Sequence, residues 1–444
     1  MTTAPSLQTG SPAGYDAIII GAGVIGSAVA YNLAKSGMKT LSVDALPAAG
    51  YGSTSSSAAV IRTYYSTLDG SAMAFEGYHD WKYWPQTLQT DDNNGLAQFI
   101  ETGTLVMKTE ANNRLERVLT HADALEIPYE HWTREQIVQR MPGYNLERFY
   151  PPKSMEDDAF GMPTGGQVEG AIFFPKGGYV DDPQIAARNL KDAAVRHGAT
   201  FLFNTKVVKI TVEDNRVTGI VCEDGSVHSA RVVINVGGPH SGKVNALLDG
   251  DAGIKIRHRP LRQEVVQIKP PGSLGYSREG LLVSDSDIAC YVKPGSGGQL
   301  MIGSENPPCD DHLEEDPDTF HRDLTDRALA YAYRYSQRLP ELGVSQHPVG
   351  VADLYDATDD WLPIYDRSDV DGYYLAIGTS GNQFKNAPVA GRLMRQLIEY
   401  CESGRDHDND PLQFKLNHID HTLNTATFSR KRDLTQESSF SVLG

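Results

Sequence analysis

A lone lysine near the end of the chain stands in a segment whose composition is typical of ligand-binding loops. Lys385 follows the glycine-rich run "GTSGNQF" (378–384) and precedes the helical pattern "APVAGRLMRQLI" (387–398). A loop that runs from glycines into a helix presents backbone N–H groups and the positive end of the helix dipole, and this arrangement binds anions. We therefore expect an anion or an anionic group here, although a single lysine on a loop is more often simply solvated.

A second glycine loop stands at the front of the chain, in "YDAIIIGAGVIGSAVAYNLAKSGMKTLSVDA" (15–45). An apolar strand over 17–20 leads into G-x-G-x-x-G at Gly21, Gly23 and Gly26. A helix over 24–35 and a strand over 40–43 that ends in Asp44 follow. The glycines allow a tight turn, close approach of a pyrophosphate and close packing of helix on strand, and the acid is placed for a ribose hydroxyl. The spacing predicts a dinucleotide site that includes Val24 and Ile25. NAD and FAD both use this unit, so the motif leaves the cofactor open.

Composition limits the partners and the compartment. The formal net charge of −17 argues against nucleic acid or an anionic membrane surface, and it means that an anionic substrate needs local positive residues. The four cysteines are scattered without metal-binding spacing, and no apolar run approaches a membrane span. Residues 1–14, "MTTAPSLQTGSPAG", lack the features of a signal peptide and predict a flexible tail. We expect a cytoplasmic protein without a metal site.

The middle of the chain departs from a plain NAD-binding domain. A helix is expected over 183–196, followed by three alternating strands separated by "EDN" and "EDG" turns, which predict an antiparallel meander. A buried strand, "RVVINVGG" (231–238), then returns the chain to the parallel sheet. We predict an α/β fold: a Rossmann-like domain with a β-meander insertion, and a second domain built on an antiparallel sheet.

This order of segments resembles the FAD domain of the D-amino-acid oxidase superfamily of flavoproteins. Later stretches resemble its sarcosine oxidase and dimethylglycine dehydrogenase branch: "RPLRQEVVQIKPP" (259–271), "ACYVKPGSGGQLMIGSE" (289–305), "DLYDATDDWLPIYDR" (353–367) and the loop at 378. The resemblance runs in order from about residue 15 to 400. We accordingly expect a discontinuous FAD-binding domain (15–74, 164–249 and 349–404), a substrate-binding domain (75–163 and 250–348) and a C-terminal tail (405–444).

The resemblance implies roles for individual residues. In this family the late glycine loop faces the flavin ring, and the lysine of G-x-S-G-x-x-F-K, here Lys385, holds the substrate carboxylate together with an arginine that corresponds to Arg62. Tyr291 is expected to line the substrate pocket and completes the predicted catalytic set. The further predicted FAD contacts are Ser53, Thr54, Ser55, Val207, Val208, Gly237, Gly238, Gly378, Gly381, Asn382, Gln383 and Phe384.

The sequence departs from the family at two places. Asp353 stands where some members attach FAD through a cysteine, and no histidine precedes His79, so FAD is expected to be bound non-covalently. Met301 stands at or beside the position of a lysine that helps oxidases activate oxygen, and residues 299–305 contain no Lys or Arg. This pattern favours a dehydrogenase that passes electrons to a quinone or a carrier protein.

The resemblance implies oxidation of a secondary or N-methylated amino acid by hydride transfer to FAD, with hydrolysis of the resulting imine. Oxidation of a D-amino acid or a 2-hydroxy acid is an alternative. A hydroxy acid needs a base, for which His240 and His258 are the nearest candidates. A flavin-carrying subunit of a larger electron-transfer complex and an NAD-dependent dehydrogenase are the remaining alternatives.

Overall fold

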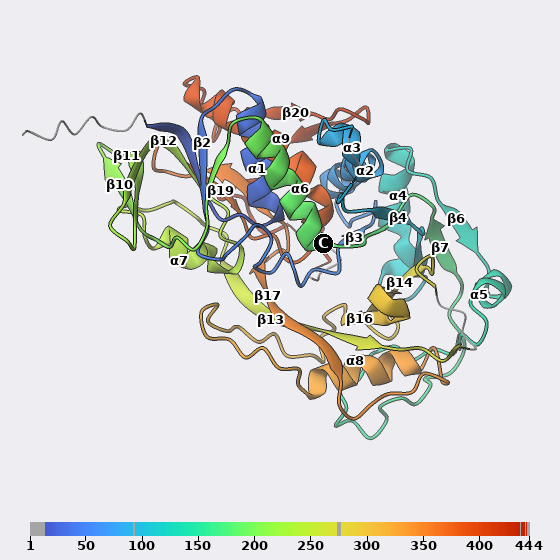
Figure 1. Cartoon of the computed structure of the whole chain (residues 1–444). Coiled ribbons are helices and arrows are strands. Elements are labelled where there is room, and N and C mark those ends of the chain that lie inside the picture. The colour runs from blue at the N-terminus through green and yellow to red at the C-terminus, as the bar shows by residue number, and fades with distance from the viewer. Residues whose placement is uncertain (1–13, 92–93, 273–276, 436, 440, 442–444) are drawn as a thin grey trace, which may run out of the picture.

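Two large sheets organise the protein, one at each end of the molecule (Figure 1). The computed structural model describes residues 14–91, 94–272, 277–435, 437–439 and 441. Residues 1–13, which make up most of the predicted N-terminal tail, lie outside the described residues.

The first sheet is parallel in its central part. Its strands follow the order β9 (Thr200–Leu202), β2 (Thr40–Val43), β1 (Tyr15–Ile20), β12 (Val227–Asn235), β19 (Tyr373–Ile377) and β18 (Ile364–Arg367), and only the last pair is antiparallel. Ala17, Ile18 and Ile19 are fully buried because the central strand is covered on both faces. The predicted meander is the antiparallel series β10 (Val207–Glu213), β11 (Arg216–Cys222) and β12. These elements confirm the predicted Rossmann-like sheet with a meander.

Three helices lie side by side on one face of this sheet: α1 (Val24–Lys35), α6 (Pro183–Arg196) and α9 (Ala387–Glu402) (Figure 1). The sequence sets their ends. Asp182 caps α6 by accepting a hydrogen bond from the Ile185 N–H at 2.9 Å, and Pro183 occupies the first turn. Gly391 brings α9 against α1, since a Cβ there would lie 2.5 Å from the Ala28 carbonyl oxygen. α1 and α9 each begin after one of the two glycine loops, so the two loops lead into neighbouring helices.

The second sheet is antiparallel except where β14 meets β5. Its strands follow the order β17 (Val349–Thr358), β13 (His258–Ile268), β16 (Leu300–Ser304), β15 (Cys290–Pro294), β14 (Leu282–Asp285), β5 (Thr104–Met107), β7 (Ala171–Phe174) and β6 (Glu130–Trp132). Helix α8 (Asp326–Ser336) packs on one face (Figure 1). This sheet confirms the predicted antiparallel second unit.

Smaller elements join the two sheets. A three-stranded sheet contains β3 (Val60–Ile61), β8 (Gly178–Val180) and β4 (Phe99–Glu101). The remaining helices are α2 (Leu68–Lys82), α3 (Trp84–Thr87), α4 (Glu116–Ala124), α5 (Arg134–Arg140) and α7 (Ser241–Asn245), with short 3-10 turns that include η2 (Gly238–His240) and η5 (Phe384–Asn386). Helix α2 is continuous across the proposed domain boundary at 74/75 and packs against α9 and η5.

The segment expected to be a C-terminal tail is part of the fold over its described residues. It forms the hairpin of β20 (Gln413–Lys415) and β21 (Thr422–Asn424) and the 3-10 turn η6 (Thr425–Phe428). Arg430 is fully buried and pairs with Asp366 at 3.0 Å, Asp408 at 2.8 Å and Asp369. The polar composition of this segment concealed its integration, because one of its charges, Arg430, is neutralised inside the protein while most of the others are exposed.

Candidate cofactor- and substrate-binding site

The front glycine loop brings the start of α1 directly onto the end of β1. Gly21 has a φ of +112°, and a Cβ there would overlap the Val236 carbonyl oxygen. A Cβ on Gly26 would overlap the carbonyl oxygen of Gly21. No acidic side chain lies in the first turn of α1, so the positive end of its dipole is not neutralised from within the helix. This cradle fits the pyrophosphate of a dinucleotide.

Two predicted cofactor residues hold this loop. The Ala22 N–H donates to Asp44 Oδ2 at 2.7 Å, and the Val24 N–H donates to Thr54 Oγ1 at 3.0 Å. Burial raises the pKa of Asp44, while hydrogen bonds from the Leu46 and Ala22 N–H groups counteract the shift. A carboxylate has more acceptor positions than these two donors use, so Asp44 can still accept a ribose hydroxyl.

The late glycine loop is held by Asp356 at the end of β17. Asp356 Oδ2 accepts the Gly378 N–H at 2.6 Å, and its backbone oxygen accepts the Ser380 N–H at 2.7 Å. Asp356 therefore takes the Gly378 N–H, and the contact of Gly378 to FAD stays a prediction. His258 Nδ1 lies 2.9 Å from the other Asp356 oxygen. Burial works to lower the pKa of His258, but the bond to Asp356 outweighs it and raises the pKa.

Arg62 and Lys385 converge on the ring of Tyr65. The Arg62 guanidinium carbon lies 4.3 Å from the ring centroid, and Lys385 Nζ lies 5.0 Å from it. Lys385 Nζ donates to the Tyr65 hydroxyl at 2.8 Å and to the Asn382 carbonyl at 2.6 Å. Both cations are buried, with relative exposures of 5% and 3%. Burial, and then the charge of Arg62, hold the pKa of Lys385 well below its usual value. Two buried cations brought together from distant segments form a site for an anion.

An aromatic cluster positions Lys385. The indole N–H of Trp81 donates to the Lys385 carbonyl at 2.8 Å, and its ring stacks on Phe384 at 5.1 Å. A Cβ on Gly77 would lie 2.5 Å from the same carbonyl oxygen, so α2 approaches Lys385 closely. The buried aromatic residues of the run "YHDWKYWPQ" (78–86) thus pack in the core beside Lys385. Phe384, a predicted FAD contact, has its ring against Trp81.

Two neighbouring tyrosines of the second sheet lie near the late loop, and one of them, Tyr355, packs on it. Tyr291 on β15 packs over Gly303, and Tyr355 on β17 packs over Gly381, where a Cβ would overlap either ring. Burial, and then Tyr355, raise the pKa of Tyr291 well above its usual value. Tyr355, which the sequence did not indicate, therefore lies between Tyr291 and the loop that carries Lys385.

A buried lysine lies directly opposite Met301. Lys293 on β15 pairs with Met301 on β16, so their side chains share one face of the sheet. Lys293 is 4% exposed, its Nζ lies 4.1 Å from the Tyr179 ring centroid, and burial lowers its pKa to about 8. The strand over 299–305 has no basic residue, but the neighbouring strand supplies one to the same face.

Glu305, directly after β16, is a second residue that the sequence did not single out. It is 5% exposed, and its carboxylate accepts hydrogen bonds from Ser284 Oγ at 2.5 Å and Ser286 Oγ at 2.8 Å. Burial raises the pKa of Glu305 to about 7, and the charge of Arg62 opposes this shift. An acid at the end of the apolar segment "QLMIG" was the only available signal. Pairing between β14, β15 and β16 is needed to bring it near Arg62.

The other predicted contacts are distributed around the two loops. Ser53 and Ser56 donate to Asp353 at 3.1 and 2.7 Å. The segment 53–56 is therefore held to β17 at Asp353, the position where the resemblance places the covalent FAD attachment of some members. Ser55 donates to the Gly52 carbonyl. Val207 is buried within the meander and Val208 is 41% exposed. Gly237 and Gly238 follow β12, and Gln383 bonds to Asn382, Tyr365 and Asn386. Their contacts to FAD stay predictions.

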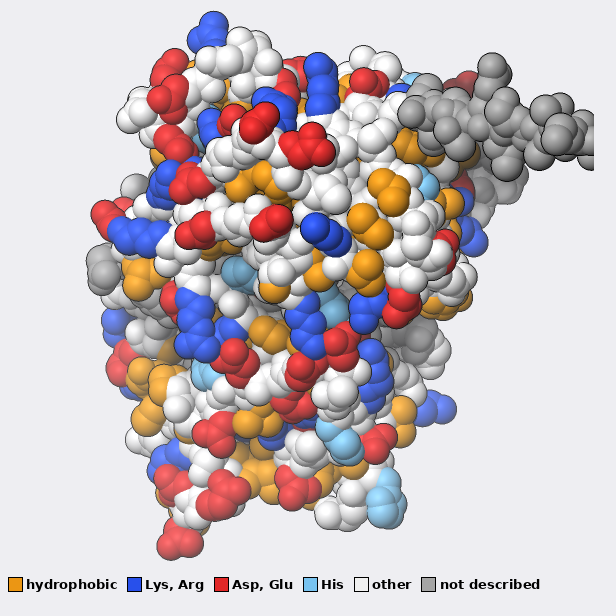
Figure 2. Space-filling model, turned by 90° about the vertical axis from the view of Figure 1, so that its left-hand side faces the viewer, with side chains coloured by type: hydrophobic (Ala, Val, Ile, Leu, Met, Phe, Trp, Pro, Cys, Tyr) orange, Lys and Arg blue, Asp and Glu red, His pale blue; other side chains and the backbone are white. Residues whose placement is uncertain are grey.

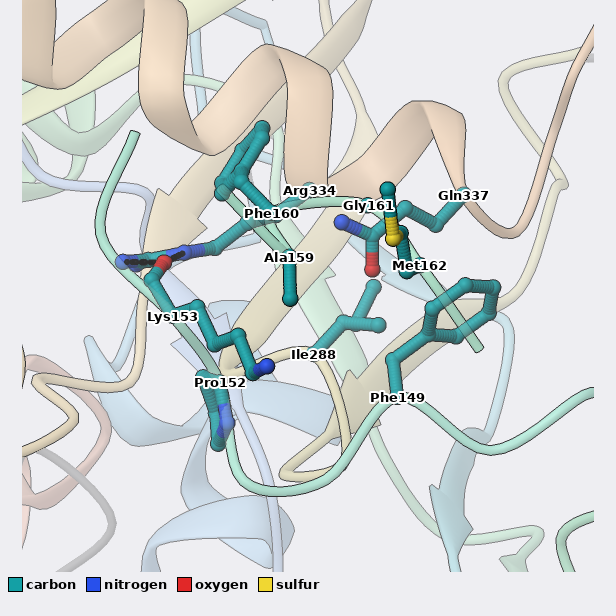
Figure 3. Close-up of a pocket in the computed structure, with 10 residues that line it drawn as sticks. All are labelled: Phe149, Pro152, Lys153, Ala159, Phe160, Gly161, Met162, Ile288, Arg334 and Gln337. Carbon is teal, nitrogen blue, oxygen red and sulfur yellow. Dashed lines mark hydrogen bonds between the residues drawn. The ribbon is translucent and has the colours of Figure 1, made fainter. Parts of the chain in front are cut away.

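Two hollows lie away from these residues. One, between α8 and the loop 149–162, has a volume of about 10 Å³, and Arg334 there donates to the Lys153 carbonyl at 2.9 Å (Figure 3). The other, of about 540 Å³, is open and is lined by Lys243, His258 and Glu314 among others. Arg62 and Lys385 line neither of them. The convergence of side chains, and not a hollow, therefore defines the candidate site.

The surface gives no sign of a single-sign binding face in the view of Figure 2, where acidic and basic side chains are interspersed. Among the described residues, no helix is both long enough and apolar enough to cross a membrane.

Known proteins are similar to this one over most of its length. The sarcosine oxidase subunit beta of Rhodobacter capsulatus is 26% identical over 86% of this chain and 84% of its own length. The glycine oxidase of Geobacillus kaustophilus is 22% identical over 88% of this chain and 95% of its own length. Among solved structures, L-proline dehydrogenase of P. horikoshii superposes with a TM-score of 0.72 at 20% identity, covering 94% of this chain and 97% of that one.

The model of one family matches almost the entire described fold. It is that of the FAD-dependent oxidoreductases, abbreviated DAO, and it matches residues 16–397. This range includes both glycine loops, the meander and the antiparallel sheet that carries Tyr291. The chain belongs to the DAO family and is an FAD-dependent oxidoreductase.

Proposed function

We propose that this protein oxidises the C–N bond of a small amino acid with a secondary or N-methylated amine, producing an imine that water hydrolyses. The observation that carries this proposal is the convergence of Arg62 and Lys385 on Tyr65. Both cations are buried, so an anion that enters between them meets charges that water screens poorly.

In this proposal Arg62 and Lys385 bind the substrate carboxylate. The guanidinium provides a two-pronged grip and Nζ adds a point charge, which together fix the position of the α-carbon. Tyr291 and Tyr355 form a wall beside it. Orientation of this kind contributes much of an enzyme's rate acceleration.

FAD supplies the two-electron hydride acceptor when it is bound. The residues that would hold it are the front loop at Gly21, Gly23 and Gly26, Thr54, Asp44, and the loop that begins at Gly378. We propose non-covalent binding, because an aspartate, Asp353, stands at one tether position. Cys290, the buried cysteine on β15, is not proposed as a tether either, because its Sγ points to the Tyr331 carbonyl of α8.

The relatives support a small amino acid as substrate. They are named for sarcosine, glycine and L-proline, which share an α-carboxylate next to an amine-bearing carbon. A D-amino acid would fit the same two cations. For a 2-hydroxy acid, His240 is bonded to Asp318 on the surface and His258 is bonded to Asp356, so neither histidine is directed at the Arg62–Lys385 pair.

Anaerobic titration of the purified holoenzyme tests the substrate class. Sarcosine, N,N-dimethylglycine, L-proline, several D-amino acids and 2-hydroxy acids are added in turn while flavin absorbance is followed. We expect bleaching with a secondary or N-methylated amino acid. Bleaching by hydroxy acids alone would refute the amine assignment and leave the carboxylate site intact.

We propose a quinone or a carrier protein as electron acceptor, because Met301 stands where a basic residue would activate oxygen. Admitting air to the reduced enzyme tests this, since an oxidase is reoxidised within seconds and a dehydrogenase is not. The similarity to a protein named as a subunit also supports a larger complex. Size-exclusion chromatography of the protein alone, with flavin reduction as the activity readout, tests whether a partner is needed.

A further inference from the structure

Glu305 shares one face of the second sheet with Tyr291, a predicted catalytic residue, and with Lys293. Tyr291 pairs with Gly303 and with Ser284, and Lys293 pairs with Met301, so these positions alternate onto the same face. Glu305 continues this series two residues beyond Gly303. Its bond to Ser284 fixes the carboxylate on that face.

The surroundings of Glu305 leave its carboxylate available to a cationic ligand. In the described part of the chain, Glu305 forms no ion pair with a lysine, arginine or histidine. A carboxylate has about four acceptor positions, and the two serines use one on each oxygen. A buried acid that has two hydroxyl donors, with the charge of Arg62 only partly offsetting its burial, is costly to ionise, so a cation that reaches it is bound strongly.

Several charged and titratable groups face Glu305 from the elements around it. They are Ser284 and Asp285 at the end of β14, Ser286 after it, and Arg62 and Tyr64 after β3. Asp285 is neutralised by Arg338 at 2.7 Å. Arg62 lies close enough to influence the ionisation of both Glu305 and Tyr64. Arg62 therefore links the two charges, because it influences both Lys385 and Glu305.

We propose that Glu305 binds the substrate's ammonium group and accepts its proton, so that the site recognises a zwitterion by both of its charges. This inference rests on the proposed function. An N–H bond of the ammonium breaks, an O–H bond forms on Glu305, and the electron pair stays on nitrogen. That lone pair makes the adjacent C–H bond a hydride donor, and the two electrons go to FAD as oxidant. Water then hydrolyses the iminium to a carbonyl compound, an amine and a proton. The amine takes the proton held on Glu305 and leaves as an ammonium, which restores the carboxylate.

Isosteric ligands separate this proposal from a purely structural role. N,N-dimethylglycine has a protonated nitrogen where 3-methylbutanoate has a carbon. Trimethylglycine and 3,3-dimethylbutanoate form a second pair with the same replacement, but the cationic nitrogen of trimethylglycine carries no N–H. Dissociation constants are measured from the flavin absorbance change on anaerobic rapid mixing, before any reduction. For at least one pair, we expect the wild type to bind the cationic member about 10–150-fold tighter, as charge-assisted bonds typically give. In Glu305→Gln this ratio should fall to about 1–2, with the carbon isosteres binding as before.

The variant is expected to fold, since a glutamine oxygen can accept from Ser284 and its amide can donate to Ser286. Glu305→Asp retains the charge and should recover part of the ratio. Ser286→Ala removes a donor to the carboxylate, so it should shift the low-pH limb of the flavin-reduction rate to higher pH. Wild type should show this limb near pH 7, because the carboxyl pKa is raised to about 7 and only the ionised form accepts a proton. Glu305→Gln should lack it.

The outcomes are distinct. If carboxylates bind but the ratio of the two dissociation constants is unchanged in Glu305→Gln, the role of Glu305 is refuted. The proposed carboxylate site at Arg62 and Lys385 then remains. If no carboxylate binds and no amino acid reduces the flavin, the proposed function itself fails. A limb near pH 7 that persists in Glu305→Gln would also overturn the assignment.

Discussion

Replacing Lys385 with methionine separates its charge from its packing. Methionine has a similar length. The two groups that accept hydrogen bonds from Nζ remain bonded to each other, because the Tyr65 hydroxyl also donates to the Asn382 carbonyl at 2.6 Å. No buried acceptor is therefore left unsatisfied. The carboxylate loses one charge-assisted contact, typically worth about 1.5–3 kcal/mol, while Arg62 remains. We expect the dissociation constant of 3-methylbutanoate, measured by flavin absorbance, to rise about 10–150-fold.

The same variant should not lose stability. Burial and Arg62 hold the Lys385 pKa below its usual value, so the unfolded chain binds more protons than the folded one as pH falls below about 10.5. The resulting cost to the folded state is absent above that pH and grows as pH decreases. Lys385→Met removes it, so urea unfolding at pH 7 should show equal or greater stability, with a smaller gain at pH 10.

An exposed lysine provides the matched control. Lys415 lies on β20 with 59% of its side chain exposed, and Lys415→Met should change neither quantity. The reasoning is refuted if Lys385→Met binds 3-methylbutanoate as tightly as the wild type does. It is equally refuted if unfolding shows a large loss of stability, since Lys385 would then be a structural ion.

Three further predictions concern the cofactor loop, the electron acceptor and the C-terminal segment. Gly26→Ala should lose FAD on gel filtration, because its Cβ would overlap the Gly21 carbonyl, whereas Gly343→Ala, whose Cβ meets open space without a left-handed φ, should retain FAD. Lys293→Met should change reoxidation of the reduced enzyme by air less than about 2-fold if the acceptor is not oxygen; a drop of 10-fold or more would show that this lysine activates oxygen. Arg430→Met leaves the buried Asp366 without its arginine partner and should lower the free energy of unfolding in urea by about 3–5 kcal/mol.

The first sheet and its helices were predictable because local sequence specifies them. The helices over 24–35 and 183–196 have the predicted bounds, since apolar periodicity and end signals such as Pro183 and Gly37 act within a few residues. The front loop was predictable for the same reason. The spacing of its glycines is a local signal, although the contact of Gly21 is with the carbonyl of Val236, which follows β12 far along the chain.

The C-terminal segment shows where composition misleads. Residues 405–435 are rich in charge, which resembles a solvated tail, yet Arg430 is buried by acids from three separate positions. A sequence shows how many charges a segment carries, but whether they meet partners depends on distant segments.

By itself, the sequence determined the dinucleotide loop, the meander and, through family resemblance, the pairing of Arg62 with Lys385. Only the tertiary structure decided what surrounds that pair. Tyr355, Lys293 and Glu305 lie on one face of the second sheet because antiparallel neighbours alternate their side chains. That register is set by contacts between strands far apart in sequence, so no local pattern could indicate which buried acid lies beside Arg62.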